Sequence, residues 1–256
     1  MRAPPSQSLD AERLFDKRAQ WYDDAHDSER VDGHALRARM AKVVQLVGAG
    51  PGAVVDVGMG PGRLLDALAG RGWAVSGIDV SARMVDLARL RLPAAVERLA
   101  RAPAERLPFD DSSFDVAVAT GVLEYVTDPQ AALAEVARVL RPGGRLVGSI
   151  PNQWALHVVS KRIYYPAVAL ARSLGRGRIP APGPRRWIAR ATLPTLLAGA
   201  GLELERTAYT SYAAAPTPLD LVLAGPSVRV AEWLERRQTG GPLLATQLVF
   251  LASKPR

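Results

Sequence analysis

Residues 54–63 read Val-Val-Asp-Val-Gly-Met-Gly-Pro-Gly-Arg, and this stretch decides the fold class. The valines form the short apolar run that is typical of a parallel strand covered on both faces. Gly58, Gly60 and Gly62 carry no Cβ, so the turn after the strand can adopt positive φ and a ligand can lie against its backbone. A helix is predicted to begin near Arg63, with free N–H groups and a positive dipole end that face the ligand. The stretch therefore predicts a strand, a turn and a helix that bind an anionic or carboxylate-bearing cofactor.

The spacing of the glycines and of two acidic residues narrows the choice of cofactor. In the dinucleotide fingerprint G-x-G-x-x-G, the third glycine would stand where this chain has Arg63. Asp56 comes two residues before the first glycine of the turn. Asp79 ends a second apolar strand, residues 73–78, and follows Gly62 by seventeen residues. A carboxylate at that place can accept hydrogen bonds from both hydroxyls of a ribose.

These residues resemble the first two motifs of the class I S-adenosylmethionine-dependent methyltransferases. Three later stretches continue the resemblance, at residues 103–115, 122–129 and 139–146. In that family, the pattern LPF…D…SFD in the first stretch leads into the fourth strand, and LRPGG in the last is the turn before the fifth. The resemblance is close over residues 50–152, and it is nearest to the ubiquinone-type O-methyltransferases.

The alternation of strands and helices predicts the fold class. Strands are expected at residues 53–57, 73–78, 95–101, 114–120, 145–150, 202–212 and 244–253. With helices between them they give an α/β fold with a Rossmann-like, doubly wound, mostly parallel sheet. The resemblance implies seven strands, the last of them antiparallel. The predicted segments are an N-terminal leader and helical cap (1–47), the S-adenosylmethionine-binding core (48–152), a basic and aromatic lid inserted after strand five (153–190), and the C-terminal part of the core (191–256) with a helical insertion at 213–241.

The resemblance also implies which residues hold S-adenosylmethionine. Asp56 and the three glycines would hold its amino-acid end, and Asp79 its ribose. The alternative for Asp79 is a helix N-cap, a position that Ser81 suits better. Met84 would pack on the adenine or belong to the core. The full predicted set is Tyr22, Asp56, Gly58, Gly60, Gly62, Asp79, Val80, Met84, Ala104, Glu105 and Thr120.

The adenine edge departs from the family pattern. Residues 102–105 read Ala-Pro-Ala-Glu where many members have Gly-Asp-Ala-Glu. Pro103 therefore replaces the aspartate that would accept from the adenine amino group. The backbone of Ala104 and the side chain of Glu105 remain as candidates for that edge.

Residues 15–23 resemble the N-terminal helix that closes over the cofactor in this family. The apolar positions of that helix also fit simple packing of an amphipathic helix on the sheet. Phe15 is predicted to pack in this way, and Tyr22 is predicted to contact the cofactor.

Methyl transfer from a sulfonium is an in-line displacement, so the protein mainly aligns the reactants and excludes water. Thr120 and Gly121 would face the donated methyl group. A hydroxyl or amine acceptor also needs a base, for which His157, after strand five, is the first candidate and Glu124 the second. His157 could equally be a packing or surface residue. Where ubiquinone-type relatives carry a metal-binding E-x-x-E-H, this chain has Gly121, Glu124 and Tyr125, and no metal is predicted.

Basic residues are concentrated in one part of the chain. The net charge is +8, and no acidic residue occurs between Glu135 and Glu203, where there are eleven basic ones. Trp154 and Trp187 lie in the same window. Arginine beside tryptophan suits a lipid interface or an anionic substrate, although a solvated, arginine-biased insertion has the same composition. The lid at 153–190 is predicted to close the substrate pocket and to contact an anionic membrane.

Composition and missing motifs limit the possible location and function of the protein. The chain has no cysteine, no apparent signal peptide and no apolar run that could span a membrane, so a cytoplasmic location is predicted. Strand four ends in residues 119–122, Ala-Thr-Gly-Val, which lack the N-P-P-[YF] tetrad of nucleic-acid amino methyltransferases, and nucleic acid is not expected as a partner. The predicted function is O-methylation of a small hydrophobic or anionic molecule in biosynthesis or secondary metabolism. The alternatives are N- or C-methylation of a small molecule or lipid, and a catalytically inactive, cofactor-binding regulatory protein.

Overall fold

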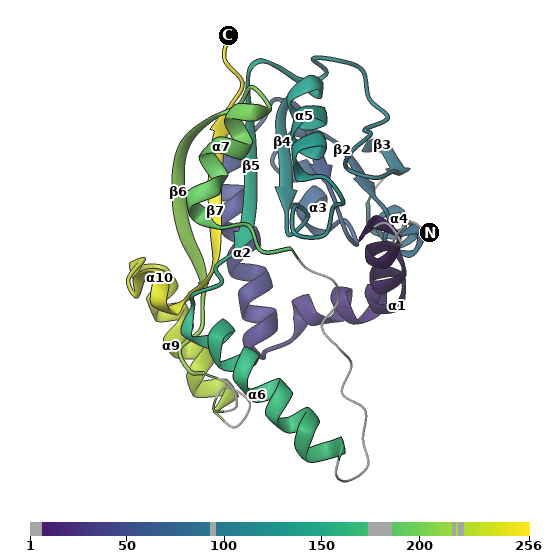
Figure 1. The fold of residues 1–256 in the computed structure, drawn as a ribbon. Coiled ribbons are helices and arrows are strands. Elements are labelled where there is room, and N and C mark those ends of the chain that lie inside the picture. Colours follow the sequence, from purple (N-terminus) through teal and green to yellow (C-terminus); the bar gives the residue numbers. More distant parts are fainter. Residues whose placement is uncertain (1–6, 93–95, 174–185, 217–218, 220–222) are drawn as a thin grey trace, which may run out of the picture.

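Seven strands form one sheet in the order β3-β2-β1-β4-β5-β7-β6 (Figure 1). They are β1 (Gly52–Val57), β2 (Trp73–Asp79), β3 (Val96–Arg101), β4 (Phe114–Thr120), β5 (Leu140–Pro151), β6 (Glu203–Tyr212) and β7 (Ala245–Ser253). Strands β1 to β5 pair in parallel, whereas β7 is antiparallel to both β5 and β6. The computed structural model describes residues 7–92, 96–173, 186–216, 219 and 223–256. The predicted seven-stranded, mostly parallel α/β fold is confirmed.

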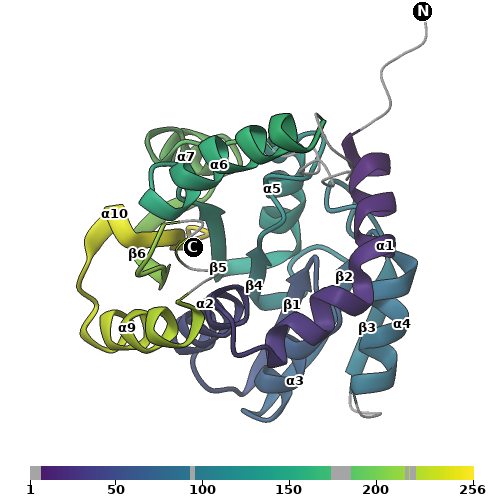
Figure 2. The same ribbon diagram turned by 90° about the horizontal axis from the view of Figure 1, so that it is seen from below.

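Helices cover both faces of the sheet (Figure 2). They are α1 (Gln7–Asp27), α2 (Val31–Val47), α3 (Arg63–Ala69), α4 (Ala82–Arg91), α5 (Pro129–Val139), α6 (Leu156–Ser173), α7 (Leu193–Gly199), α9 (Ala224–Arg237) and α10 (Gly241–Leu244), with a 3-10 turn η1 (Arg190–Thr192) before α7. The apolar side chains of α2, α3 and α4 form one core with the sheet, and those of α5 and α7 form another on the opposite face.

Strand β1 is buried on both of its faces, because its side chains alternate between the two cores. Val54 belongs to the core under α2 and α3, Val55 belongs to the core under α5, and both are fully buried. The neighbours of β1 are β2 and β4, so the strand order reverses beside it. In doubly wound folds, ligands bind at the carboxyl ends of the strands at such a point. Helices α1, α6 and α9 are additions that lie toward this edge of the sheet (Figure 1).

The region after β5 differs most from the expectation. Residues 153–190 were predicted as a basic and aromatic lid with no helix assigned, and residues 156–173 of this segment form the long helix α6. The other predicted parts that lie outside the described residues are 1–6 of the leader, 174–185 of the lid, and 217–218 and 220–222 of the later insertion. Strand β5 also begins at Leu140, earlier than predicted, since Leu140 already pairs with Phe114 of β4. Within the described residues, no helix combines the length and the apolar character needed to cross a membrane.

Candidate active site

The turn after β1 has the backbone that its glycines predict. Gly58, Gly60 and Gly62 have φ values of 77°, 55° and 79°. The N–H groups of Gly58 and Met59 donate to the carbonyl of Ile78 at 2.8 and 2.9 Å, which fixes the turn against the end of β2. A Cβ on Gly58 would lie 2.3 Å from Val122 Cγ2, whereas a Cβ on Gly60 would meet no atom within 4 Å. Gly58 is therefore needed for packing, and Gly60 faces open space.

Gly62 has a different surrounding from the other two glycines. A Cβ at this position would lie 3.1 Å from Ala88 Cβ and 3.2 Å from Leu92 Cδ1. The glycine thus allows the start of α3 to pack closely against α4. Gly62 is not among the described residues that line the hollows beside the turn.

Asp79 connects the turn to the end of β2. One carboxylate oxygen accepts from the N–H of Gly60 at 2.9 Å, and the other accepts from the N–H of Ser81 at 2.9 Å. Burial raises the pKa of Asp79 to about 6. Ser81 is the N-cap of α4, because its Oγ accepts from the N–H of Met84 at 3.1 Å. The cap thus falls on Ser81, and Asp79 faces the turn.

Asp56 is the most unusual charged group of this edge. Its side chain is buried, and Oδ1 has no hydrogen-bond partner among the described residues. Burial, with the nearby Asp79 carboxylate adding to it, raises the pKa of Asp56 to about 7. A buried carboxylate oxygen without a partner is costly, and a ligand that brings a cation or an N–H donor would relieve that cost.

A hollow of about 670 Å³ lies between the turn and helix α1. It is lined by nine of the predicted cofactor residues: Tyr22, Gly58, Gly60, Asp79, Val80, Met84, Ala104, Glu105 and Thr120. Pro103 lies in the same lining, beside Ala104. One oxygen of Glu105 accepts from the N–H groups of Thr127 and Asp128, at 2.8 and 3.3 Å, so this oxygen is directed to a neighbouring turn. Met84 is buried and lines the hollow.

An adjoining hollow of about 460 Å³ contains Asp56 and shares Tyr22, Gly58, Gly60 and Thr120 with the first. Arg39 of α2 also lines it and donates to the Tyr22 hydroxyl at 3.0 Å. Nothing in the motifs pointed to Arg39, because it reaches the site from a helix that precedes them. Arg39 and Asp56 place a cation and an anion in one small space, which fits the carboxylate and the ammonium of the methionine part of S-adenosylmethionine.

An aromatic cluster closes the first hollow from the side of α1. Phe15 and Tyr125 meet edge to face with ring centroids 5.0 Å apart, and Phe15 and Tyr22 do so at 6.4 Å. Phe15 lines the hollow. Its prediction as a simple packing residue was therefore incomplete, because the same ring packs and faces the cavity.

The two predicted catalytic residues lie elsewhere. Neither His157 nor Glu124 is among the described residues that line the two hollows. His157 is buried at the start of α6, and its Nδ1 lies 3.2 Å from the carbonyl oxygen of Ala215. Glu124 is buried too, and its main-chain carbonyl accepts from the N–H of Arg186 at 2.7 Å. The described residues contain no group of three or more acidic or histidine side chains that could hold a metal ion.

Known proteins resemble this chain in sequence and in fold. Residues 55–148, which include the glycine turn, match the protein family described as "Methyltransferase domain". By sequence, this segment is therefore similar to a methyltransferase domain. The demethylmenaquinone methyltransferase of Tropheryma whipplei (strain Twist) is 38% identical over 138 residues, which are 53% of this chain and 56% of that protein. The chain thus spans about half the length of that curated relative.

Solved structures share the fold of the methyltransferase domain and of its flanks. The 1,6-didemethyltoxoflavin-N1-methyltransferase of Burkholderia thailandensis, with bound 1,6-didemethyltoxoflavin and S-adenosylhomocysteine, has a TM-score of 0.61 and 20% identity, over 100% of this chain and 92% of that one. The 4+2 cyclase SpnF has a TM-score of 0.64 and 22% identity, over 100% and 98%. One fold therefore serves enzymes that are named for different reactions, and the reaction of this chain must be argued from its own site.

The open space at Gly60 leads to a first prediction. Gly60→Ala is expected to weaken the affinity for S-adenosylhomocysteine at least about tenfold, because the new Cβ would stand in the hollow, and to cost about 1 kcal/mol of stability through its positive φ. Gly72→Ala is the matched control. Gly72 also has positive φ and open space around its Cβ position, and it lies outside both linings. Titration calorimetry and thermal unfolding measure both effects, and equal affinities in the two variants would contradict the prediction.

Proposed function

We propose that this chain transfers the methyl group of S-adenosylmethionine to a small-molecule acceptor. The observation that carries the proposal is the pair of buried carboxylates at the glycine turn, with Oδ1 of Asp56 lacking a partner among the described residues. Asp56 and Arg39 hold the two charges of the amino-acid end, and Asp79 accepts from the ribose hydroxyls. Bound there, the cofactor supplies an electrophilic methyl group on a sulfonium.

The chain's own residues align the acceptor and keep out water. Thr120 ends β4 and lines both hollows, and Gly121 follows it in the lining of the larger one, where the methyl group would be presented. The rings of Phe15, Tyr22 and Tyr125 exclude water from that side, which strengthens the electrostatic contacts inside.

We place the methyl group on oxygen, as the resemblance to ubiquinone-type O-methyltransferases implies. The names of the similar proteins specify a demethylated menaquinone and a ring nitrogen. Oxygen therefore rests on the sequence resemblance, whereas His157, which follows strand five, and Glu124 stay the first and second candidates for the general base. Neither residue lines the hollows. Either one could therefore act as the base only if the site rearranges when the acceptor binds.

The experiment uses labelled donor and a cell extract. The purified chain is incubated with S-adenosylmethionine labelled in the methyl group, and the labelled product is identified by mass spectrometry. A labelled small molecule, lost in Asp79→Ala, supports the proposal, and its chemistry identifies the acceptor atom. Tight binding of S-adenosylhomocysteine without any labelled product would support the cofactor-binding regulatory protein instead. Label in RNA or DNA would overturn the small-molecule assignment.

A membrane surface is the second part of the proposal, with the enzyme cytoplasmic and peripheral. Among the described residues, the exposed large apolar side chains other than Leu90 belong to α1, α6, α9, α10 or their adjoining loops: Trp21, Trp154, Leu156, Ile163, Trp187, Leu219, Leu223, Val230, Trp233 and Leu243. Arg162 stacks on Trp187 with its guanidinium carbon 4.3 Å from the ring centroid. Exposed tryptophans beside arginines suit an anionic lipid interface.

Vesicle co-sedimentation tests this surface. The chain is expected to sediment with vesicles rich in phosphatidylglycerol and not with phosphatidylcholine alone. Ile163→Glu is expected to abolish the binding, and Leu90→Glu, at an equally exposed position on α4, is the control. Equal sedimentation with both lipids would exclude the anionic membrane and leave the methyl-transfer proposal intact.

A further inference from the structure

Helix α1 presents two adjoining faces to the cofactor-binding core. Ala11, Phe15 and Tyr22 line the larger hollow and form its roof. Each of these three residues is followed directly by a carboxylate, and a fourth carboxylate lies four residues after the last of them. The four are Glu12, Asp16, Asp23 and Asp27. Spacings of four, seven and four residues put these carboxylates along one side of the helix. The roof and the acidic stripe therefore move together.

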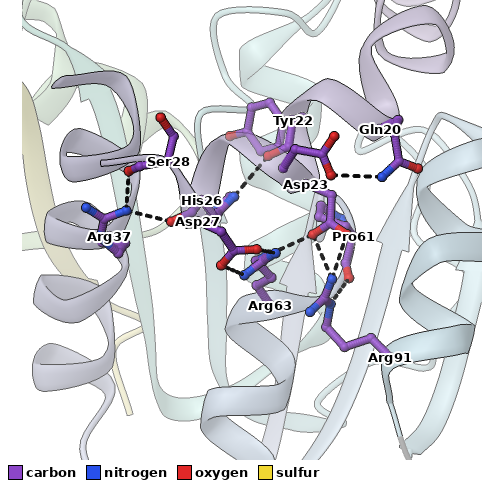
Figure 3. Close-up of polar contacts among 11 residues, drawn as sticks. Gln20, Tyr22, Asp23, His26, Asp27, Ser28, Arg37, Pro61, Arg63 and Arg91 are labelled. Atoms are coloured by element: carbon purple, nitrogen blue, oxygen red, sulfur yellow. Dashed lines mark hydrogen bonds and ion pairs between the residues drawn. The ribbon is translucent and has the colours of Figure 1, made fainter. Parts of the chain in front are cut away.

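Two arginines of the core hold the C-terminal half of this stripe (Figure 3). Arg63 Nε lies 2.6 Å from Asp23 Oδ1, and the two terminal nitrogens of Arg63 reach the two oxygens of Asp27 at 2.8 and 2.5 Å. Arg91 Nη2 lies 2.7 Å from each oxygen of Asp23. We name Arg63, Arg91, Asp23 and Asp27 the ionic latch. Arg63, at the place of the missing third glycine, thus joins two carboxylates that lie one turn apart on α1.

The ionic latch is attached to the glycine turn itself. Arg91 Nε donates to the carbonyl of Pro61 at 2.9 Å, and Arg63 is the first residue of α3. Pro61 lies between Gly60, which faces the hollow, and Gly62, which packs on α4. Any lifting of the C-terminal half of α1 must therefore break bonds to the residues that carry the turn.

The N-terminal half of α1 has its own attachments. Asp16 accepts from the Ser81 hydroxyl at 2.5 Å, and Glu12 accepts from Arg101 at 2.6 Å. Ser81 and Arg101 follow or end the strands β2 and β3 beside Asp79. All four carboxylates thus bind groups of the elements that form the cofactor site, and the roof is held down by charge and hydrogen bonds.

The surroundings of the ionic latch favour a measurable effect. The side chains of Asp23 and Arg63 are only 13% and 20% exposed, whereas that of Asp27 is 72% exposed. An exposed pair alone is worth little and is screened by salt, but bidentate arginine pairs in a partly covered network are stronger.

We propose that Arg63 and Arg91 are positioning residues that hold α1 closed over the cofactor site, so that ionic strength and the ionic latch set the rate of cofactor exchange. The identity of the exchanging molecule rests on the proposed function, whereas the closing of α1 does not. When only the closed form binds fully, the apparent affinity falls with the fraction of closed molecules. Loss of the latch raises the apparent dissociation constant and speeds dissociation together.

Stopped-flow dissociation of S-adenosylhomocysteine, followed by the fluorescence of Trp21 on α1, tests the proposal. Arg63→Ala and Arg91→Ala are expected to speed dissociation about tenfold, and Asp27→Ala about threefold. The double variant with Arg63→Ala and Asp27→Ala should match Arg63→Ala alone, because among the described residues Asp27 hydrogen-bonds only to Arg63. Arg89→Ala is the matched control: this exposed arginine of α4 pairs with Asp86 of the same helix at 3.5 Å.

Salt and hydrogen exchange provide independent outcomes. In the unmodified chain, S-adenosylhomocysteine is expected to dissociate faster as NaCl rises from about 50 mM to about 500 mM, because salt screens the partly exposed ion pairs of the latch. The rate for Arg63→Ala should depend less on salt, because this variant lacks those pairs. Hydrogen exchange of the α1 amides without any cofactor should rise in Arg63→Ala and Asp27→Ala and stay unchanged in Arg89→Ala.

These outcomes separate the two proposals. If S-adenosylhomocysteine does not bind, the proposed function fails, while the hydrogen exchange still decides whether the latch closes α1. If α1 exchanges equally in all four proteins, the ionic latch is overturned whatever binds. The exposed position of Asp27 keeps Asp27→Ala folded, so the decision does not depend on the stability of the arginine variants.

Discussion

Asp79→Ala is expected to weaken the binding of S-adenosylhomocysteine at least about a hundredfold. The carboxylate of Asp79 lies at the end of β2 and lines the larger hollow, where it would accept from both ribose hydroxyls. A hydrogen bond to a charged acceptor is worth about 1.5–3 kcal/mol, and two are lost. The same substitution frees the N–H groups of Gly60 and Ser81, so the glycine turn also loses its support.

The two contributions can be separated by measuring stability as well as affinity. Because the carboxylate is buried, its removal also relieves a desolvation cost, and thermal unfolding of the cofactor-free variant is expected to shift by no more than about 5 °C. Asp86→Ala is the control, since Asp86 lies exposed on α4 and pairs only with Arg89 in the part of the chain described by the structure. An Asp79→Ala variant that binds within about threefold of the unmodified chain would contradict the role of Asp79.

Local sequence carries the parts of the fold that depend on neighbours along the chain. The apolar run of β1, the positive φ of Gly58 and Gly60, and the Ser81 cap all follow from residues within a few positions of each other. Helix α6 was not predicted, because a local signal in its sequence argues against a helix. The proline at position 166 argues against a helix interior.

Contacts between distant segments could not be predicted in this way. Arg39 reaches the Tyr22 hydroxyl and the space beside Asp56 from α2, and no motif marks it. Arg63 was recognised only as the absence of a third glycine, yet its guanidinium binds two carboxylates of α1. Gly62 was assigned to the cofactor by its pattern, although it packs against Ala88. A sequence pattern predicts the region of a ligand site. Which long side chains pair across helices can be seen only in the folded structure.

Asp56→Asn is expected to stabilise the cofactor-free protein and to lower its affinity for the cofactor. The pKa of Asp56 is raised from 3.8 to about 7 by burial and by the nearby Asp79. Between these values the folded chain holds a proton that the unfolded chain has released. The free energy of unfolding therefore falls as the pH rises from about 4 to 7, and the full cost is present above pH 7. Asparagine cannot ionise, so the variant avoids a cost on the order of 4 kcal/mol at pH 8.

The measured quantity is the difference in free energy of unfolding between Asp56→Asn and the unmodified chain, from urea denaturation between pH 4 and 8. A difference is needed because Asp115 and Glu135, whose pKa values are lowered by Arg141 and Arg138, give the opposite slope in both proteins. The difference should grow with pH up to about 7 and then stay constant. A constant difference over the whole range would show that Asp56 ionises normally.

Cofactor affinity should follow the opposite trend, because the ammonium group of the cofactor pairs with the ionised form of Asp56. The affinity of the unmodified chain for S-adenosylhomocysteine is expected to rise from pH 5 to pH 8 as Asp56 loses its proton. In Asp56→Asn the affinity should be about tenfold or more lower at pH 8 and nearly independent of this ionisation. A single buried carboxylate would thus destabilise the empty protein and bind the cofactor over the same pH range, which is the expected behaviour of a residue kept for binding at the expense of stability.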